Sequence, residues 1–124
     1  MIYRALRPLL FLLPPETAHH VGFGALRLAM AVPGVGAVTQ ALLAPSDPAL
    51  EVEAFGVRFP TPVGLAAGFD KDAIGFAALG RLGFGHVEVG TLTAHAQAGN
   101  DKPRMFRLPA DRAVINRMGF NNRG

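Results

Sequence analysis

The run Pro-Val-Gly-Leu-Ala-Ala-Gly at residues 62–68, followed directly by Phe-Asp-Lys at residues 69–71, decides the fold. A short apolar run without charges is typical of a strand that is buried on both faces of a parallel sheet. Residues 73–82 then show helical spacing, and a second run suited to a buried strand follows at residues 86–92. Strand, helix and strand in this order predict a βαβ unit, and so an α/β fold.

On both sides of this unit the sequence alternates between apolar and polar residues, which predicts two β-hairpins. Residues 50–54 and 57–59 flank the turn-forming pair Phe55-Gly56. Residues 105–108 and 113–115 flank a second turn near Pro109.

Three apolar helices are expected ahead of the hairpins, at residues 2–13, from about residue 15 to residue 32, and at residues 37–43. These helices carry few charges, so they either pack on a larger body or lie on a membrane surface, and the composition leaves both alternatives open. Their strictly apolar runs are shorter than the roughly 20 residues of a membrane-spanning helix. Pro14 and Pro15 end the first apolar patch early, which argues against a signal peptide.

The composition sets further limits. A complete (β/α)8 barrel needs about 250 residues, so a chain of 124 residues holds at most about half of one. The absence of cysteine excludes disulfides, Cys-ligated zinc and Cys nucleophiles from these residues. His19 and His20 are adjacent and cannot share a helix face, and no acidic pair completes a metal site.

The charge favours anionic partners other than nucleic acid. The net charge is +3, and the excess of arginine and lysine lies toward the two ends of the chain. Such basic segments suit phosphates, carboxylates or lipid headgroups. With no tryptophan and one tyrosine, aromatic residues are not interleaved with the basic ones, as the stacking sites of a nucleic-acid-binding protein require.

Two segments carry candidate chemistry. Residues 64–68 are small and end a strand, so a flat or phosphorylated ligand can approach the backbone there, with Lys71 adding a cation. Gly90-Thr91 ends the next strand at the same edge of the sheet. The alternative is tight packing under a turn, with Lys71 simply exposed.

The second segment is residues 116–122, which contain three asparagines and Arg117. Asparagine donates and accepts hydrogen bonds, which suits the edge of a pyrimidine-like ring, and an arginine can hold a carboxylate. The alternative is an Asn/Gly-rich turn without a ligand.

Taken together, the motifs resemble the N-terminal part of dihydroorotate dehydrogenase. The resemblance covers nearly the whole chain and rests on six ordered motifs: Gly-Leu-Ala-Ala-Gly-Phe-Asp-Lys at residues 64–71, Gly-Phe-Gly at 83–85, Val-Glu-Val-Gly-Thr at 87–91, Gly-Asn-Asp-Lys-Pro-Arg at 99–104, Phe-Arg-Leu-Pro at 106–109 and Ile-Asn-Arg-Met-Gly-Phe-Asn-Asn at 115–122. The helical extension, with Pro-Glu-Thr-Ala-His at residues 15–19, is similar to that of class 2, the membrane-associated, quinone-dependent branch.

The resemblance implies a TIM (β/α)8 barrel with FMN at its carboxyl end, preceded by a helical membrane-associated extension. Residues 1–46 would form the extension and the quinone tunnel, and residues 47–124 the first, incomplete part of the barrel. Dihydroorotate would lose a proton to a serine base and a hydride to FMN, giving orotate in pyrimidine biosynthesis, and a membrane quinone would take the electrons. The implied location is peripheral, on the cytoplasmic side of the inner membrane; no metal and no oligomer is indicated.

The resemblance also assigns site residues by position. Quinone contacts fall on His19 and Arg107. The cofactor contacts match Ala67, Gly68, Phe69, Asp70, Lys71 and Thr91, and the substrate contacts match Lys71, Asn116, Arg117, Met118, Gly119 and Phe120.

One departure from the family pattern concerns the base. The serine base of the family is expected beyond Gly124, so these residues contain no catalytic base and we expect the 124-residue chain to be an inactive fragment. Two alternatives remain: a non-catalytic membrane-surface module built on residues 1–46, and a phosphate-binding half-barrel that assembles with another chain.

Overall fold

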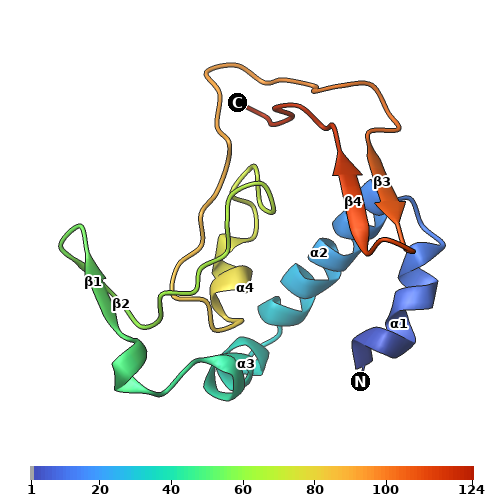
Figure 1. Ribbon diagram of the computed structural model, residues 1–124. Coiled ribbons are helices and arrows are strands. Elements are labelled where there is room, and N and C mark those ends of the chain that lie inside the picture. The colour runs from blue at the N-terminus through green and yellow to red at the C-terminus, as the bar shows by residue number, and fades with distance from the viewer. Residues whose placement is uncertain (1) are drawn as a thin grey trace.

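Three helices form the N-terminal part of the computed structural model, which describes residues 2–124. Helix α1 spans Ile2–Phe11, α2 spans Pro15–Ala31 and α3 spans Val35–Leu43 (Figure 1). A proline in the first turn of α2 gives up no helical hydrogen bond. Gly34, with a φ of +84°, turns the chain between α2 and α3 in a conformation that glycine adopts without strain. The three predicted helices are confirmed, with small shifts at their ends.

Helix α2 is central to the packing, because it contacts α1, α3, α4 (Phe76–Gly80) and β3 (Met105–Leu108). Nevertheless Phe23 is the only large side chain of α2 that is fully buried, at 6% exposure. Leu12, near the end of α1, is 80% exposed, and Leu42 of α3 is 78% exposed. The three helices therefore present a large apolar surface that the described residues do not cover.

Within residues 2–124, no single helix is both long enough and apolar enough to cross a membrane. Taken together, α2 and α3 reach the required length and composition, but they are bent by 106° at the break between them.

The first predicted hairpin is confirmed. Strand β1 (Val52–Ala54) pairs antiparallel with β2 (Val57–Phe59). The two turn residues, Phe55 and Gly56, have φ values of +55° and +72°. Positive φ at both central positions defines the type I′ turn, whose twist matches that of the flanking strands.

The predicted parallel pairing forms between residues 63–68 and 85–90, but neither segment is a regular strand. Leu65 and Val87 form one parallel bridge, and backbone hydrogen bonds of 3.0 and 2.9 Å flank it. The predicted parallel pairing is therefore confirmed, but the prediction that both segments form full strands is wrong. Parallel strands are regular where neighbours cover both faces and both edges, and no third strand pairs with either segment within residues 2–124.

The helix between these two segments is shorter than predicted. Helix α4 spans Phe76–Gly80, whereas the spacing predicts a helix over residues 73–82. The carboxylate of Asp70 accounts for the late start, because it accepts hydrogen bonds from the backbone N–H of Ile74 (2.9 Å) and Gly75 (2.8 Å). Residues 70–75 are thus held as a loop around a side chain that is 1% exposed.

The second predicted hairpin is also confirmed, with β4 ending one residue later than expected. Strand β3 (Met105–Leu108) pairs antiparallel with β4 (Ala113–Asn116), and each terminal residue of one strand lies opposite a terminal residue of the other. Arg107 lies opposite Val114 in this register.

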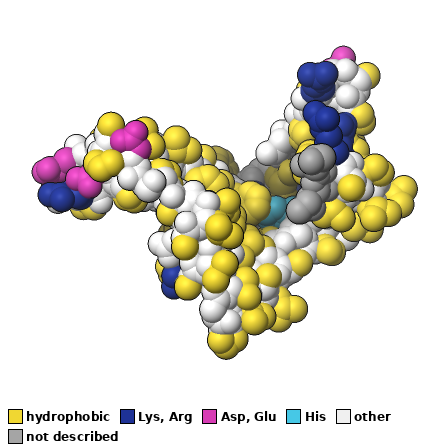
Figure 2. Space-filling view, turned by 90° about the horizontal axis from the view of Figure 1, so that it is seen from below, with side chains coloured by type: hydrophobic (Ala, Val, Ile, Leu, Met, Phe, Trp, Pro, Cys, Tyr) yellow, Lys and Arg dark blue, Asp and Glu magenta, His cyan; other side chains and the backbone are white. Residues whose placement is uncertain are grey.

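The molecule as a whole is open. The β1–β2 hairpin and α4 lie on one side, α1 and the β3–β4 hairpin lie on the other, and α2 runs between the two sides from the β3–β4 hairpin to α3 (Figure 1). Seen from below, a hollow separates two arms of the surface (Figure 2). The accessible surface is 9037 Å², whereas a compact protein of this mass exposes about 6,400 Å². Helices, hairpins and one parallel pair agree with the predicted α/β class; the complete barrel and the two predicted domains, residues 1–46 and 47–124, stay predictions.

Candidate functional site

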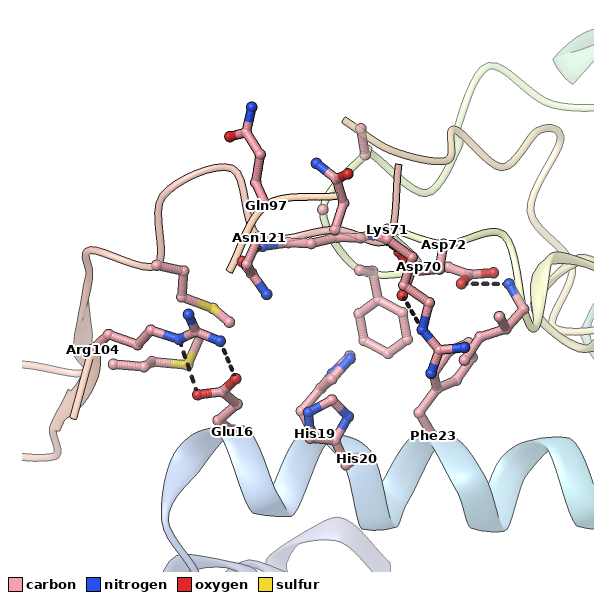
Figure 3. Close-up of a pocket in the computed structure, with 18 of the residues that line it drawn as sticks. Glu16, His19, His20, Phe23, Asp70, Lys71, Asp72, Gln97, Arg104 and Asn121 are labelled. Atoms are coloured by element: carbon pink, nitrogen blue, oxygen red, sulfur yellow. Dashed lines mark hydrogen bonds and ion pairs between the residues drawn. The ribbon is translucent and has the colours of Figure 1, made fainter. Parts of the chain in front are cut away.

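A cavity with a volume of about 550 Å³ lies above α2. Figure 3 shows side chains of α2 pointing into it from below, with Lys71 and Asn121 on the opposite side. Its walls come from four parts of the chain that are far apart in sequence: α2, residues 65–74, residues 97–105 and residues 118–123.

One wall of the cavity is made of small residues at the end of the parallel pair. Gly68 has a φ of +100° and open space where a Cβ would be. Its N–H donates to the carbonyl oxygen of Gly90 at 2.8 Å, which fixes this backbone against the neighbouring segment. A flat ligand can therefore lie directly against the backbone here.

Lys71 supplies a cation beside this wall. Its Nζ donates a hydrogen bond to Oδ1 of Asn121, which orients the ammonium group inside the cavity. Burial, followed by the positive charge of Arg104, lowers the pKa of Lys71 from its usual value. An anionic ligand would oppose both effects, because a further negative charge beside the ammonium group stabilises its charged form.

An arginine and a glutamate connect α2 with the opposite wall of the cavity. Nη2 of Arg104 lies 2.6 Å from Oε1 of Glu16, and its Nε lies 3.2 Å from Oε2. Nη1 donates to the carbonyl oxygens of Ala98 (2.7 Å) and Asn100 (3.0 Å). Nζ of Lys102 forms a second ion pair with Glu16, 3.4 Å from its Oε1. The hydrogen bond from Arg104 lowers the pKa of Glu16, and the same bond raises that of Arg104.

Aromatic side chains form the end of the cavity nearest α2. The ring of His19 lies 4.7 Å from that of Phe69 and 5.8 Å from that of Phe23, measured between centroids. Burial, and then the neighbouring His20, lower the pKa of His19 below its usual value. A neutral imidazole among phenyl rings gives this end of the cavity an apolar character.

An ion pair between Asp72 and Arg123 joins the loop after Lys71 to the C-terminal segment of the cavity wall. Asp72 accepts a hydrogen bond from the backbone N–H of Arg123 at 2.9 Å, and its other oxygen lies 3.4 Å from Nε of the same residue. This contact brings residues 121–123 over the loop that carries Lys71.

The structure brings most of the predicted cofactor residues together. Thr91 is the exception: it is exposed and does not line the cavity. Asp70 lines the cavity, but both of its oxygens bind backbone N–H groups of its own loop. The predicted cofactor residues that line the cavity are Ala67, Gly68, Phe69, Asp70 and Lys71.

The predicted substrate residues are brought together less completely. Of residues 116–120, Met118 alone lines the cavity. The reason lies in the backbone, because the N–H of Arg117 donates to the carbonyl of Arg104, and the carbonyl of Met118 accepts from Asn100. Asn116, Arg117, Gly119 and Phe120 lie outside the cavity walls, and their role as substrate contacts stays a prediction.

The two predicted quinone residues lie in different places. His19 lines the main cavity, whereas Arg107 lines a separate cavity between α1 and the β3–β4 hairpin. Glu16, Arg104 and Asn121 line the main cavity but were not among the individually predicted site residues, although Asn121 belongs to the candidate segment 116–122. Asn121 could have been found, since it lies in the quoted asparagine-rich motif, but no local signal links Glu16 with Arg104.

The comparisons with known proteins identify the family. A family model described as dihydroorotate dehydrogenase matches residues 49–124, more than half of the chain. The chain belongs to the dihydroorotate dehydrogenase family. Two curated relatives, each named dihydroorotate dehydrogenase (quinone), are 57% identical (Mycobacterium leprae) and 58% identical (Mycolicibacterium gilvum) over 123 residues. These matches cover 99% of this chain and 35% of each relative, so the chain spans about a third of the length of such dihydroorotate dehydrogenases.

Two crystal structures of dihydroorotate dehydrogenase from Eimeria tenella resemble the fold. The ligand-free form has a TM-score of 0.68 and 45% identity, over 89% of this chain and 28% of that one. The complex with ferulenol has a TM-score of 0.66 and 46% identity, over 86% and 26%. This likeness supports the α/β class.

Proposed function

We propose that this chain forms part of a quinone-dependent enzyme that oxidises (S)-dihydroorotate to orotate with FMN as prosthetic group. The observation that carries the proposal is the cavity in which Lys71, oriented by Asn121, faces a wall of small residues. Identity of 57% over 99% of the chain to a relative named dihydroorotate dehydrogenase (quinone) supports it.

The residues present fit the ring system of a flavin. Small side chains at residues 66–68 and the open space at Gly68 leave room for a planar ring against the backbone. Lys71 supplies a cation beside that ring position. When bound, FMN would accept the hydride of dihydroorotate and later release two electrons to quinone, yielding quinol.

Lys71 would act as an electrostatic group. Its ammonium group is partly buried. The positive charge therefore favours negative charge on the ligand beside it. Asn121 fixes the direction of the ammonium, so the cation need not reorganise when the reaction begins.

The proton acceptor of the reaction would not be one of the residues that line the main cavity. The one serine of the chain, Ser46, does not line the cavity. We therefore keep the proposal that the serine base belongs to the part of such proteins that this chain does not span.

The apolar end of the cavity suits the quinone. His19, Phe23 and Phe69 form an aromatic surface beside α2, and the exposed apolar side chains of α1–α3 suit a membrane surface. We propose a peripheral position on the cytoplasmic side of the inner membrane, which would give the cavity access to a lipid-soluble acceptor.

The test is flavin reduction in the full-length protein. After reconstitution with FMN without oxygen, adding dihydroorotate should bleach the flavin absorbance, and adding a quinone should restore it. Lys71→Ala should slow the bleaching by about a hundredfold, the loss typical of one preorganised charged group. Arg58→Ala, on the exposed β1–β2 hairpin, serves as the control and should leave the rate unchanged. No bleaching by dihydroorotate in a flavin-loaded protein would overturn the proposal.

A further inference from the structure

The loop that carries Lys71 contacts the C-terminal segment through two neighbouring residues. Lys71 donates a hydrogen bond to Oδ1 of Asn121. Oδ1 of Asp72 accepts one from the backbone N–H of Arg123 at 2.9 Å, and its Oδ2 lies 3.4 Å from Nε of Arg123. Within residues 2–124, these are the hydrogen bonds and ion pairs that join residues 70–75 to residues 121–124. Asp72 therefore supports the same segment that carries the acceptor for Lys71.

The bond to the backbone is the stronger part of the Asp72 contact. The side chain of Arg123 is 78% exposed, and that of Asp72 is 24% exposed. An ion pair that is open to solvent contributes little to stability. A carboxylate that accepts a backbone N–H forms a charge-assisted hydrogen bond, which is about twice as strong as a neutral one. We therefore expect Asp72 to hold the segment mainly through the N–H of residue 123, whatever side chain that residue carries.

Another part of the segment is anchored independently of Asp72. Asn122 and Gln97 form an antiparallel bridge with two backbone hydrogen bonds of 3.0 Å. Oδ1 of Asn122 also lies 2.8 Å from the hydroxyl oxygen of Thr93, which donates to it. These bonds join the segment to residues 93–97 and not to the loop of Lys71. Without the Asp72 bond the segment would therefore stay in place as a whole, while its distance from Lys71 would vary.

Lys71 depends on a fixed partner because its ammonium group ends a flexible four-carbon stem. Asp72 influences this group by its charge as well as by its hydrogen bond. Burial and the charge of Arg104 lower the pKa of Lys71, whereas Glu16 and Asp72 raise it. The titratable and charged side chains that line the cavity around Lys71 are Glu16, His19, His20, Asp70, Asp72, Arg104 and Arg123. Removing the carboxylate of Asp72 would change both the direction of the ammonium group and its pKa.

We propose that Asp72 is a positioning residue for the proposed oxidation of dihydroorotate: its carboxylate holds residues 121–123 against the loop of Lys71 and so fixes the ammonium group toward the ligand. The inference rests on the proposed function and deepens it, because Asp72 was not among the predicted site residues. Asp72 acts through Asn121 and Lys71 and need not contact the ligand itself.

The first measurement is the rate at which dihydroorotate bleaches the flavin of the full-length, FMN-loaded protein without oxygen. Asp72→Ala should lower the rate at saturating dihydroorotate roughly tenfold, the loss expected for a hydrogen bond to a charged group. Asp72→Asn keeps an oxygen that can accept the N–H of Arg123, so it should retain most of the rate. The alkaline limb of its pH–rate profile should nevertheless move to lower pH, because loss of the negative charge lowers the pKa of Lys71.

A double variant shows whether Asp72 acts through Asn121. If both residues orient the same ammonium group, Asp72→Ala/Asn121→Ala should be no slower than the slower of the two single variants. Asp111→Ala removes an exposed carboxylate from the turn of the β3–β4 hairpin and is the matched control. It should leave the rate and the pH profile unchanged. Arg123→Gln keeps the backbone N–H and should slow the reaction far less than Asp72→Ala.

A second measurement follows Lys71 without turnover. The full-length protein is acetylated with acetic anhydride at a series of pH values, and mass spectrometry compares Lys71 with Lys102, whose side chain is 67% exposed. Because only the uncharged amine reacts, the midpoint for Lys71 should lie at lower pH in Asp72→Ala and Asp72→Asn than in the wild type. Equal reactivity of the two lysines in Asp72→Ala would identify misfolding, and Asp72→Asn would then decide.

Three results would overturn the positioning role. The first is a wild-type rate and pH profile in Asp72→Ala. The second is an equal loss of rate in Asp72→Ala and Asp72→Asn with an unchanged acetylation midpoint, which a merely structural residue would give. The third is a double variant whose loss is the product of the two single losses.

The wild type separates this inference from the proposed function. If dihydroorotate fails to bleach its flavin, the proposed function is wrong, and the role of Asp72 in that reaction is wrong with it. If the wild type is bleached and any of the three results above is found, the inference about Asp72 is wrong and the proposed function stands.

Discussion

Arg104 and Glu16 are joined by two hydrogen bonds, of 2.6 and 3.2 Å, although 88 positions separate them in the sequence. Their side chains are 7% and 14% exposed. The same guanidinium also binds two carbonyl groups of the loop ahead of β3. One side chain thus attaches the start of α2 to the opposite wall of the main cavity.

Removing the carboxylate should destabilise the protein strongly. Glu16→Ala leaves the buried guanidinium of Arg104 without its counter-charge, and we expect a loss of about 3 kcal/mol in the free energy of unfolding. Urea unfolding of the full-length protein measures it. Glu53→Ala, which removes an exposed glutamate, is the control and should change stability by less than about 0.5 kcal/mol. An equally small effect for Glu16→Ala would show that the pair contributes little.

The same pair should make stability depend on pH. The hydrogen bond from Arg104 lowers the pKa of Glu16, so the folded state binds the proton less readily than the unfolded state. The stabilisation is complete above the unfolded pKa of about 4.3 and is lost as the pH falls through the lower, folded pKa. The difference in unfolding free energy between wild type and Glu16→Gln should therefore shrink on acidification below pH about 4.3. A difference that stays constant would contradict this assignment.

Asn121 should act as a positioning residue for Lys71. Asn121→Ala removes the acceptor that orients the ammonium group, and we expect dihydroorotate to reduce the flavin about tenfold more slowly, as for a lost hydrogen bond to a charged group. Asn121→Asp keeps an acceptor and adds a negative charge, which should raise the pKa of Lys71 and shift the alkaline limb of the pH–rate profile upward. A profile identical in all three proteins would exclude this role for Asn121.

Replacing Gly75 and Gly24 by alanine should change the stability of the protein in opposite directions. A Cβ at Gly75 would collide with the ring of Phe23, so Gly75→Ala should destabilise the packing of α4 on α2 by about 1–3 kcal/mol. Gly24 lies inside α2 with open space around it, so Gly24→Ala should stabilise by about 0.5–1 kcal/mol. Thermal unfolding of both variants checks the pair, and a shift of the same sign in both would contradict the packing described here.

Local patterns predicted the elements well, because their causes are local. The turn pair Phe55-Gly56, the proline at the start of α2 and the alternation on either side of residues 109–112 each act within a few residues. The regularity of the parallel pair could not be predicted, since it depends on neighbouring strands. The late start of α4 depends on the carboxylate of Asp70 capping residues 74 and 75, which the helical spacing does not reveal.

The candidate site was predicted where one segment carries it and was missed where two distant segments meet. Residues 67–71 follow directly from the small residues and Lys71 of a single motif. The contact of Glu16 with Arg104 and the separation of His19 from Arg107 depend on how α1 and α2 pack against the β3–β4 hairpin. Residue spacing along one chain contains no measure of that packing.

The distance along the chain between Glu16 and Arg104 also sets an order of events during synthesis. A ribosome that adds roughly 5–20 residues per second makes Arg104 between about 4 and 18 seconds after Glu16. Throughout that interval the first turn of α2 lacks Arg104, and once Leu43 has been added the sequences of α1–α3 are complete while Arg104 is still missing. The apolar side chains of α1–α3 are therefore exposed before the opposite wall of the main cavity has been synthesised, and the order of synthesis favours contacts among the three helices first.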